Sequence, residues 1–276
     1  MPRSDQKRSL SSATVFLGGG RITSALICGL RRAGYKSLIL VHDRNAPKLR
    51  RLTQEFDAIS EPDPCRAVSV AGLLVVAVRP DSIGTLLAAL RHSCPRPNRS
   101  LIAVSLAAGV PLTKLRVHLP QVHWARAMPS PVCRTGRGLT AVTFDRSVPG
   151  TARRLVRNFF AHVGTVLEIP EKNFDVFTAT YSPSHGYHAL ATLAEAAEKL
   201  GLDRDHALIA AAHALADAIA AFRQEKIPLE ELLYEAATPG GIAATVMDTE
   251  NRAGYKRIIE RALRAGVQRA RKNARG

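Results

Sequence analysis

The sequence predicts an α/β fold, with a doubly wound parallel sheet in the N-terminal part and an all-α domain after it. Three observations carry this prediction. From Ala13 onward, short apolar runs alternate with helical patterns, which is typical of a parallel sheet with helices on both faces. A glycine cluster stands between the first apolar run and the first helical pattern. After Pro170 the strand patterns stop, and alanine-rich helical periodicity takes over.

The composition fits a folded protein without a nucleic-acid partner. With 276 residues, the chain is long enough for one large or two ordinary domains with a sizeable core. Hydrophobic residues make up 46% and charged residues 22%, which is close to ordinary globular usage. The net charge is +16, but lysine and arginine are spread along the chain and lack the interleaved aromatic residues of single-strand binders. We expect the charge to act only through nonspecific association.

The cysteines and histidines predict no special covalent or metal site. No CxxC spacing occurs among the four cysteines, so neither a zinc site nor a disulfide framework is expected; they are Cys28, Cys65, Cys94 and Cys133. His118 and His123 flank Pro120 without a partner at metal-ligand spacing, which favours loop roles and no metal.

With no hydrophobic signal segment, a cytoplasmic protein is expected. The longest apolar run, at residues 68–78, is too short to span a membrane.

Residues 1–12 are polar and basic and are expected to form a flexible tail, and the first domain is expected over residues 13–170. Apolar runs predict its strands at residues 14–17, 37–41, 73–78, 101–104, 122–125, 139–144 and 165–168. Helical patterns predict its helices at residues 22–33, 47–56, 82–90 and 151–160.

The second domain is expected over residues 171–276 and contains only helices. Its patterns predict helices at residues 188–200, 206–223, 229–236, 242–251 and 255–271, with Gly201, Pro228 and the Pro239-Gly240-Gly241 break between them. A small domain with broad leucine and alanine faces does not bury all its apolar surface alone. This indicates a dimerisation domain.

The glycine cluster has the spacing of a dinucleotide-binding loop. The sequence TVFLGGGRIT at residues 14–23 places a G-x-G-x-x-[small] pattern between a predicted strand and a predicted helix. Gly18 permits the tight turn, Gly20 lets the backbone approach a pyrophosphate, and the helix start supplies N–H groups and positive potential. Thr23 takes the place of the third glycine. This predicts a Rossmann domain; the alternative is a glycine-rich turn without a ligand.

Two neighbouring residues bear on the choice of cofactor. Asp43 ends the second predicted strand, where an acid accepts a hydrogen bond from the ribose 2′-OH of NAD, whereas Arg44 suits the 2′-phosphate of NADP. Arg21 lies near the expected phosphates. We therefore expect NADPH, with NADH as the alternative; a solvated surface charge is the alternative for Arg44. These patterns assign the following residues to the cofactor: Gly18, Gly20, Arg21, Ile22, Asp43 and Arg44.

Read together, several later segments resemble the pyrroline-5-carboxylate reductase family. The matching segments are Val78-Arg79-Pro80 (V-K-P in the family), Ser105-Leu106-Ala107-Ala108-Gly109 (S-I-A-A-G), Arg126-Ala127-Met128-Pro129-Ser130 (R-x-M-P-N) and Thr238-Pro239-Gly240-Gly241 (S-P-G-G). Their order and spacing match over about residues 13–271. The resemblance implies a Rossmann domain, a helical domain that interlocks with a second subunit, and hydride transfer from NAD(P)H to the C=N carbon of a cyclic imino acid. It adds Val78, Arg79, Pro80 and Ala107 to the cofactor site.

The substrate segments depart from the family pattern. G-S-G-P-A-Y aligns with residues 180–185 and keeps only Pro183, and P-G-G-T-T loses both threonines at Ile242 and Ala243. A glutamate, a lysine and an asparagine of the family align with Ala191, Arg79 and Ser130. These departures leave open whether the product is proline.

The two substrate segments still predict an anion site. Pro183 and Gly241 each precede a predicted helix, whose free N–H groups are suited to a substrate anion. Substrate binding is assigned to Ser182, Ser184, Thr238, Gly240, Gly241 and Ile242. His185 and Tyr181 are the candidate catalytic residues, because both are titratable groups in the altered loop and a histidine donates a proton near neutral pH. A surface or capping role is the alternative for His185.

The main prediction is an NAD(P)H-dependent reductase of the C=N bond of a cyclic imine or imino acid, working as a homodimer or a higher homo-oligomer. One alternative is a reductase of another small carbonyl or imine substrate. β-Hydroxyacid dehydrogenases share the two-domain plan, but Lys172 comes too early and Lys199 too late in its helix for their catalytic lysine. A catalytically inactive nucleotide-binding protein and a basic nucleic-acid-binding protein are the non-enzymatic hypotheses.

Overall fold

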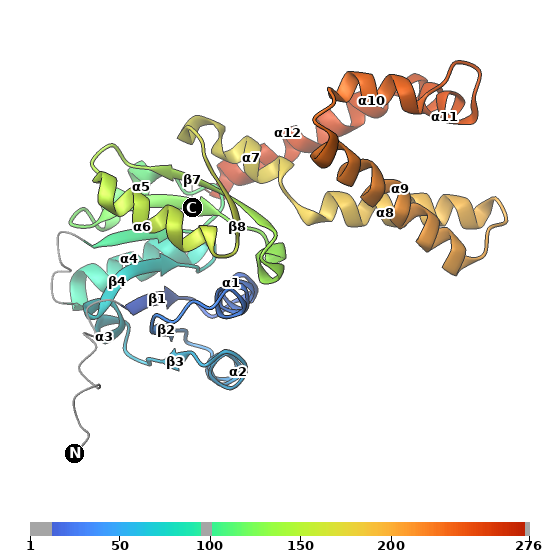
Figure 1. Ribbon diagram of the computed structural model, residues 1–276. Coiled ribbons are helices and arrows are strands. Elements are labelled where there is room, and N and C mark those ends of the chain that lie inside the picture. Colours follow the sequence, from blue (N-terminus) through green and yellow to red (C-terminus); the bar gives the residue numbers. More distant parts are fainter. Residues whose placement is uncertain (1–12, 95–100, 274–276) are drawn as a thin grey trace. The chain divides into compact units, whose positions relative to one another are not determined.

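The computed structural model describes residues 13–94 and 101–273, which form two compact units (Figure 1). The first unit reaches Tyr181 and takes up the chain again from Gly266; the second is Ser182–Ala265. The tail predicted at residues 1–12 lies outside the described residues. The domain boundary near Pro170 stays a prediction.

An eight-stranded sheet forms the centre of the first unit, in the order β3-β2-β1-β4-β5-β6-β7-β8. The strands are β1 (Ala13–Leu17), β2 (Ile39–His42), β3 (Ile59–Ser60), β4 (Ala71–Val76), β5 (Ile102–Ser105), β6 (His123–Met128), β7 (Gly138–Phe144) and β8 (Gly164–Glu168). Neighbours pair in parallel except β6 and β7, which are antiparallel. The chain winds from β1 to β3 in one direction and from β4 in the other, so a ligand crevice is expected where β1 and β4 end.

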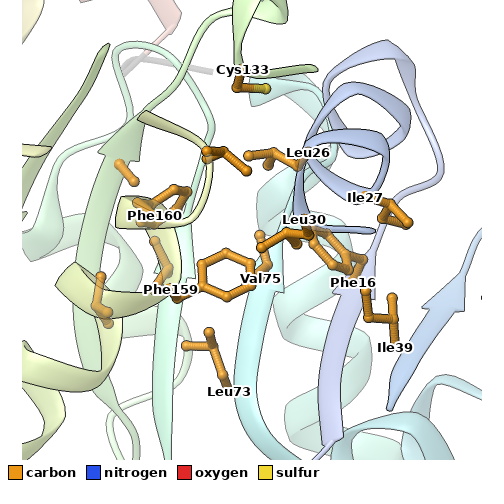
Figure 2. Packing of buried hydrophobic residues seen from close by; sticks show 14 of the residues in the cluster. Phe16, Leu26, Ile27, Leu30, Ile39, Leu73, Val75, Cys133, Phe159 and Phe160 are labelled. Carbon is orange, nitrogen blue, oxygen red and sulfur yellow. The ribbon is translucent and has the colours of Figure 1, made fainter. Parts of the chain in front are cut away.

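Helices cover both faces of this sheet, as the sequence predicted. They are α1 (Arg21–Arg32), α2 (Ala46–Phe56), α3 (Pro64–Ser69), α4 (Pro80–Ser93), α5 (Leu112–His118), α6 (Gly150–Ala161) and α7 (Phe174–Thr180), with 3-10 turns η2 (Pro131–Thr135) and η3 (Glu171–Asn173). On β4, Leu73 and Val75 join a core cluster with α1 and α6 (Figure 2), whereas Leu74 and Val76 join a second cluster with α4 and α5. This alternation buries both faces of the central strand.

Several short elements were not predicted. β3 has two residues, α3 six, and α5 and α7 seven each, which is too short for hydrophobic periodicity to identify them. The prediction that His118 and His123 lie in a connecting loop was wrong, because His118 ends α5 and His123 begins β6.

The prediction of no disulfide was also wrong, because Cys65 and Cys94 form one. Cys65 lies in α3 and Cys94 directly follows α4, and their Cα atoms are 5.0 Å apart, within the range that a disulfide bridges. The two cysteines are 29 residues apart in the sequence, and they come close only because α3 packs beside α4. Their spacing in the sequence therefore does not indicate the bond. Because of this disulfide, the cysteine pattern no longer supports a reducing compartment. The cytoplasmic location therefore stays a prediction.

Five helices make up the rest of the chain as far as residue 273, as predicted: α8 (Pro183–Lys199), α9 (Arg204–Glu225), α10 (Leu229–Ala236), α11 (Ile242–Arg252) and α12 (Tyr255–Asn273). The largest error was the start of α8, which was expected at His188. Ser182 caps the helix through its Oγ, which accepts from the Ser184 N–H, and Pro183 takes the first helical position. These two residues were the sequence signal for the earlier start.

The second unit has a small core and a large apolar surface. Among the described residues its buried cluster consists of Ala194, Ala207 and Ala211. By length and composition α9 is apolar enough to cross a membrane, although such a helix also occurs in soluble proteins. Its exposed large apolar side chains include Tyr187, Ile209, Ile219 and Phe222, and monomeric proteins seldom expose large contiguous apolar patches.

Candidate cofactor and substrate site

The predicted cofactor residues follow the carboxyl ends of four neighbouring strands. Gly18 follows β1, Asp43 follows β2, Val78 follows β4 and Ala107 follows β5. Because these strands are parallel, their carboxyl ends share one edge of the sheet. A Cβ on Gly18 would lie 2.7 Å from the carbonyl oxygen of Ala77 and 3.1 Å from the Val78 nitrogen. The fold therefore brings the glycine loop against the Val78 segment.

Gly18 and Gly20 have different surroundings. Gly18 has a φ of +109°, and its contact with Ala77 leaves no room for a side chain. Gly20 has a φ of −76°, and apart from its two chain neighbours no described residue comes within 4 Å of the position that a Cβ would take. Gly20 is the N-cap of α1 without a side-chain hydrogen bond, and the first turn holds no acidic residue. This open helix start fits a diphosphate group.

Thr23 is accommodated inside the glycine loop. Its side chain is fully buried, and its Oγ1 donates to the carbonyl oxygen of Gly18 at 2.6 Å. The buried hydroxyl is therefore satisfied within the turn, which explains how a threonine stands where the dinucleotide-binding pattern has a third glycine.

Asp43 supports the glycine loop, a role that the sequence did not reveal. Its Oδ2 accepts from the Gly19 N–H at 2.7 Å, and its Oδ1 accepts from the Asn45 N–H at 2.7 Å. Both carboxylate oxygens thus bind backbone groups. Two cations stand nearby: Lys48 has its Nζ 3.9 Å from Asp43 Oδ2, and Arg44 is exposed. The assignment of Asp43 to the ribose stays a prediction.

The other predicted cofactor residues differ in accessibility. Arg79 is exposed and is the N-cap of α4, with Pro80 in the first helical position. Ala107 is buried, and its N–H donates to Ser105 Oγ at 3.3 Å. At the start of α1, Arg21 is exposed and Ile22 is partly buried.

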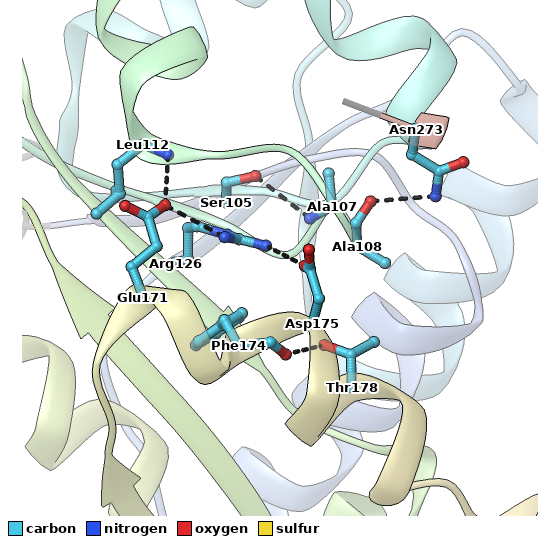
Figure 3. A network of polar contacts seen from close by, with 10 residues as sticks. All are labelled: Ser105, Ala107, Ala108, Leu112, Arg126, Glu171, Phe174, Asp175, Thr178 and Asn273. Atoms are coloured by element: carbon cyan, nitrogen blue, oxygen red, sulfur yellow. Dashed lines mark hydrogen bonds and ion pairs between the residues drawn. The ribbon is translucent and has the colours of Figure 1, made fainter. Parts of the chain in front are cut away.

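An ion-pair network around a buried arginine lies beside these loops (Figure 3). Arg126 on β6 is 3% exposed, and its guanidinium lies 3.2 Å from Glu171 Oε1 and 3.5 Å from Asp175 Oδ1. The same guanidinium lies 4.5 Å from the centre of the Phe174 ring. Glu171 also accepts from the Leu112 N–H at 2.7 Å. Arg126 therefore joins β6 to α5, η3 and α7.

Tyr181 is anchored at the end of the first unit. Its hydroxyl oxygen accepts from the Leu139 N–H at 2.7 Å and from the buried Ser130 Oγ at 3.2 Å. Both of these hydrogen bonds are accepted by the hydroxyl oxygen, so neither uses its own proton.

The predicted substrate residues lie at two helix starts of the second unit. At α8, Ser182 Oγ is 2.7 Å from Ser184 Oγ, and His185 is exposed in the first turn. At α11, Gly240 has a φ of +79° and Gly241 caps the helix without a side-chain hydrogen bond. At α11 the first N–H groups have no side-chain cap and suit an anion. At α8 the Ser184 N–H is bonded to Ser182 Oγ and the His185 N–H to the Ser182 carbonyl oxygen, so the expected free N–H groups are already bonded there.

One chain does not bring these two helix starts together. Thr238 accepts from the Gly241 N–H at 2.9 Å, and Ile242 is 88% exposed in the first turn of α11. Figure 1 shows α11 well separated from the start of α8 within the second unit. A substrate site that used both helix starts would need a second copy of the chain.

Neither a metal cluster nor a reactive buried thiol is found in the described part of the chain. Across residues 13–94 and 101–273, no three His, Cys, Asp or Glu side chains are grouped to hold a metal ion. Burial raises the pKa of the Cys133 thiol to about 12, so this residue is protonated and unreactive near neutral pH.

Two family models match this chain. The model described as pyrroline-5-carboxylate reductase dimerisation matches residues 171–273, and the model described as NADP oxidoreductase, coenzyme F420-dependent, matches residues 14–109. Together they cover the glycine loop and the helical region.

Known proteins resemble this chain over nearly its whole length. Pyrroline-5-carboxylate reductase of Mycobacterium leprae is 28% identical over 277 residues, which span 92% of this chain and 94% of that protein. The enzyme of the same name from Synechocystis is 25% identical, over 92% and 96%. The structure of Plasmodium falciparum pyrroline carboxylate reductase with NADP bound has a TM-score of 0.84 at 21% identity, over 95% of this chain and 98% of that chain. At this level of identity, the structural similarity shows that the two chains share a fold.

Proposed function

Because this chain belongs to the pyrroline-5-carboxylate reductase family, we propose that it is an NAD(P)H-dependent reductase of the C=N bond of a cyclic imine or imino acid. The single observation that carries the proposal is the open, uncapped start of α1 at Gly20, beside the Val78 segment. The bound NADP in the Plasmodium falciparum structure supports a cofactor of this class.

The first unit holds the cofactor in this proposal. The N–H groups at the start of α1 bind the diphosphate, with Arg21 and Ile22 in the first turn. Val78, Arg79, Pro80 and Ala107 border the crevice on its other side. When bound, NAD(P)H supplies the hydride that adds to the imine carbon.

The second unit holds the substrate, and a proton must reach the imine nitrogen for the reaction to balance. The helix starts of α8 and α11 bind the carboxylate or another anionic group; the residues involved are Ser182, Ser184, Thr238, Gly240, Gly241 and Ile242. His185 donates the proton at the start of α8. Tyr181 is a second donor, because its oxygen accepts two hydrogen bonds and its own proton is available.

The test is oxidation of NADPH and NADH against five- and six-membered cyclic imines, with and without a carboxylate. We expect turnover of at least one imine, and His185→Ala is expected to lower kcat about 100-fold, because general acids contribute on that order. His188→Ala is the matched control, since His188 is exposed one turn later in the same helix. Unchanged turnover in His185→Ala would reject its role. Cofactor binding without turnover of any imine would support the inactive alternative.

The cations beside Asp43 favour NADPH over NADH. Both carboxylate oxygens of Asp43 accept from backbone N–H groups, and the exposed Arg44 beside it suits a 2′-phosphate. We expect Arg44→Ala to weaken NADPH binding about tenfold, which corresponds to about 1.4 kcal/mol, and to leave NADH binding unchanged. Isothermal titration measures both affinities, and Arg50→Ala on the exposed side of α2 is the control. An equal loss for both cofactors would contradict the assignment.

The second unit forms a homodimer in this proposal. A groove between α8 and α9 is lined by Tyr187 and Ile219, which are 69% and 54% exposed. Sedimentation equilibrium is expected to give at least twice the chain mass of 29.8 kDa. Ile219→Glu is expected to shift the mass toward one chain, and Gln224→Glu, which adds a charge elsewhere on α9, is expected to leave it unchanged. A single-chain mass for the unaltered protein would overturn the proposal.

A further inference from the structure

The last turn of α12 closes on the loop at residues 105–109, which carries Ala107. Gly109 has a φ of +78°, and a Cβ on it would lie 1.9 Å from the carbonyl oxygen of Ala270. Only a glycine permits this approach. Asn273 donates from its side-chain Nδ2 to the carbonyl oxygen of Ala108 at 3.2 Å (Figure 3). Two separate contacts therefore join α12 to two successive residues of the loop.

The beginning of this loop is fixed by the sheet, but its later part depends on α12. The Leu106 N–H donates to the carbonyl oxygen of Val76 at 2.9 Å, and the Ala107 N–H donates to Ser105 Oγ. These bonds hold residues 105–107 against β4. Ala108 and Gly109 instead contact the helix end, and a loop fixed in advance binds a ligand at a lower entropic cost.

We propose that Asn273 is a positioning residue for cofactor binding, and that it acts by fixing the Ala108 carbonyl and with it the loop at residues 105–109. This inference rests on the proposed function, because it takes the loop as one wall of the cofactor crevice. Ala270 is the buried residue of α12, an otherwise largely exposed helix, so the helix end is seated on this loop. From Gly266 onward, α12 belongs to the first unit.

The test is Asn273→Asp, which keeps the shape of the side chain and removes its donor. We expect the Kd and the KM for NADPH to rise about five- to tenfold, since one hydrogen bond contributes on that scale. The KM for the imine and the thermal midpoint are expected to stay unchanged. Lys272→Ala is the control, because Lys272 lies in the same turn with an exposed side chain.

The outcomes separate this inference from the proposed function. If the unaltered protein binds neither NADPH nor NADH, the proposed function fails, and this inference fails with it. If the unaltered protein binds NADPH and Asn273→Asp binds it equally well, only the inference is overturned. A rise in the KM for the imine matching that for NADPH, or a lower thermal midpoint, would assign Asn273 to folding and likewise overturn it.

Discussion

Replacing Gly20 by alanine is expected to weaken NADPH binding at least about tenfold while leaving the fold intact. Gly20 has an ordinary negative φ, and apart from its two chain neighbours no described residue comes within 4 Å of the added methyl group. The protein alone therefore tolerates alanine, and we expect the free energy of unfolding to change by no more than about 1 kcal/mol. A diphosphate at the start of α1 would meet the methyl group directly. Fluorescence titration and urea unfolding measure the two quantities.

Two other glycines make this experiment selective. Gly150→Ala is the matched control: Gly150 stands at the start of α6, also with open space around it, and its replacement should change neither quantity. Gly18→Ala is expected to lower both the NADPH affinity and the free energy of unfolding, because its Cβ would meet the Ala77 carbonyl oxygen at 2.7 Å and its φ is positive. Normal NADPH affinity in Gly20→Ala would show that the glycine cluster is only a turn.

Arg126→Met is expected to lower the free energy of unfolding by about 2–3 kcal/mol, because hydrogen bonds to charged groups contribute on that scale. Arg126 is 3% exposed, and its removal leaves the partly buried carboxylates of Glu171 and Asp175 without their cation. Without the guanidinium, Glu171 is also no longer held in place as the acceptor of the Leu112 N–H. Urea denaturation followed by circular dichroism measures the change.

Arg157→Met is the control for this prediction. Arg157 pairs with Glu168 at 2.8 Å, closer than the Arg126 pairs, but both side chains of this pair are well exposed to water. A surface pair of this kind contributes at most about 1 kcal/mol. If the two variants were equally destabilised, burial would not be the reason for the importance of Arg126.

The sequence determined the architecture of this protein and the location of its cofactor loop. Alternating apolar runs and helical patterns predicted the sheet with helices on both faces, since hydrophobic periodicity records which face of each element is buried. The residues TVFLGGGRIT identified the loop between β1 and α1, because a glycine spacing of this kind has a local physical cause. The short helices α3, α5 and α7 were not predicted, because six or seven residues give too little hydrophobic periodicity.

The tertiary structure decided which side chains meet. The Cys65–Cys94 disulfide, the bond from the Gly19 N–H to Asp43, and the pair of Arg126 with Glu171 join residues 24 to 45 positions apart. The contact of Asn273 with Ala108 spans 165 positions. Such pairs depend on strand order and helix packing, which bring distant parts of the chain within hydrogen-bond distance. Local sequence patterns carry no record of those distances.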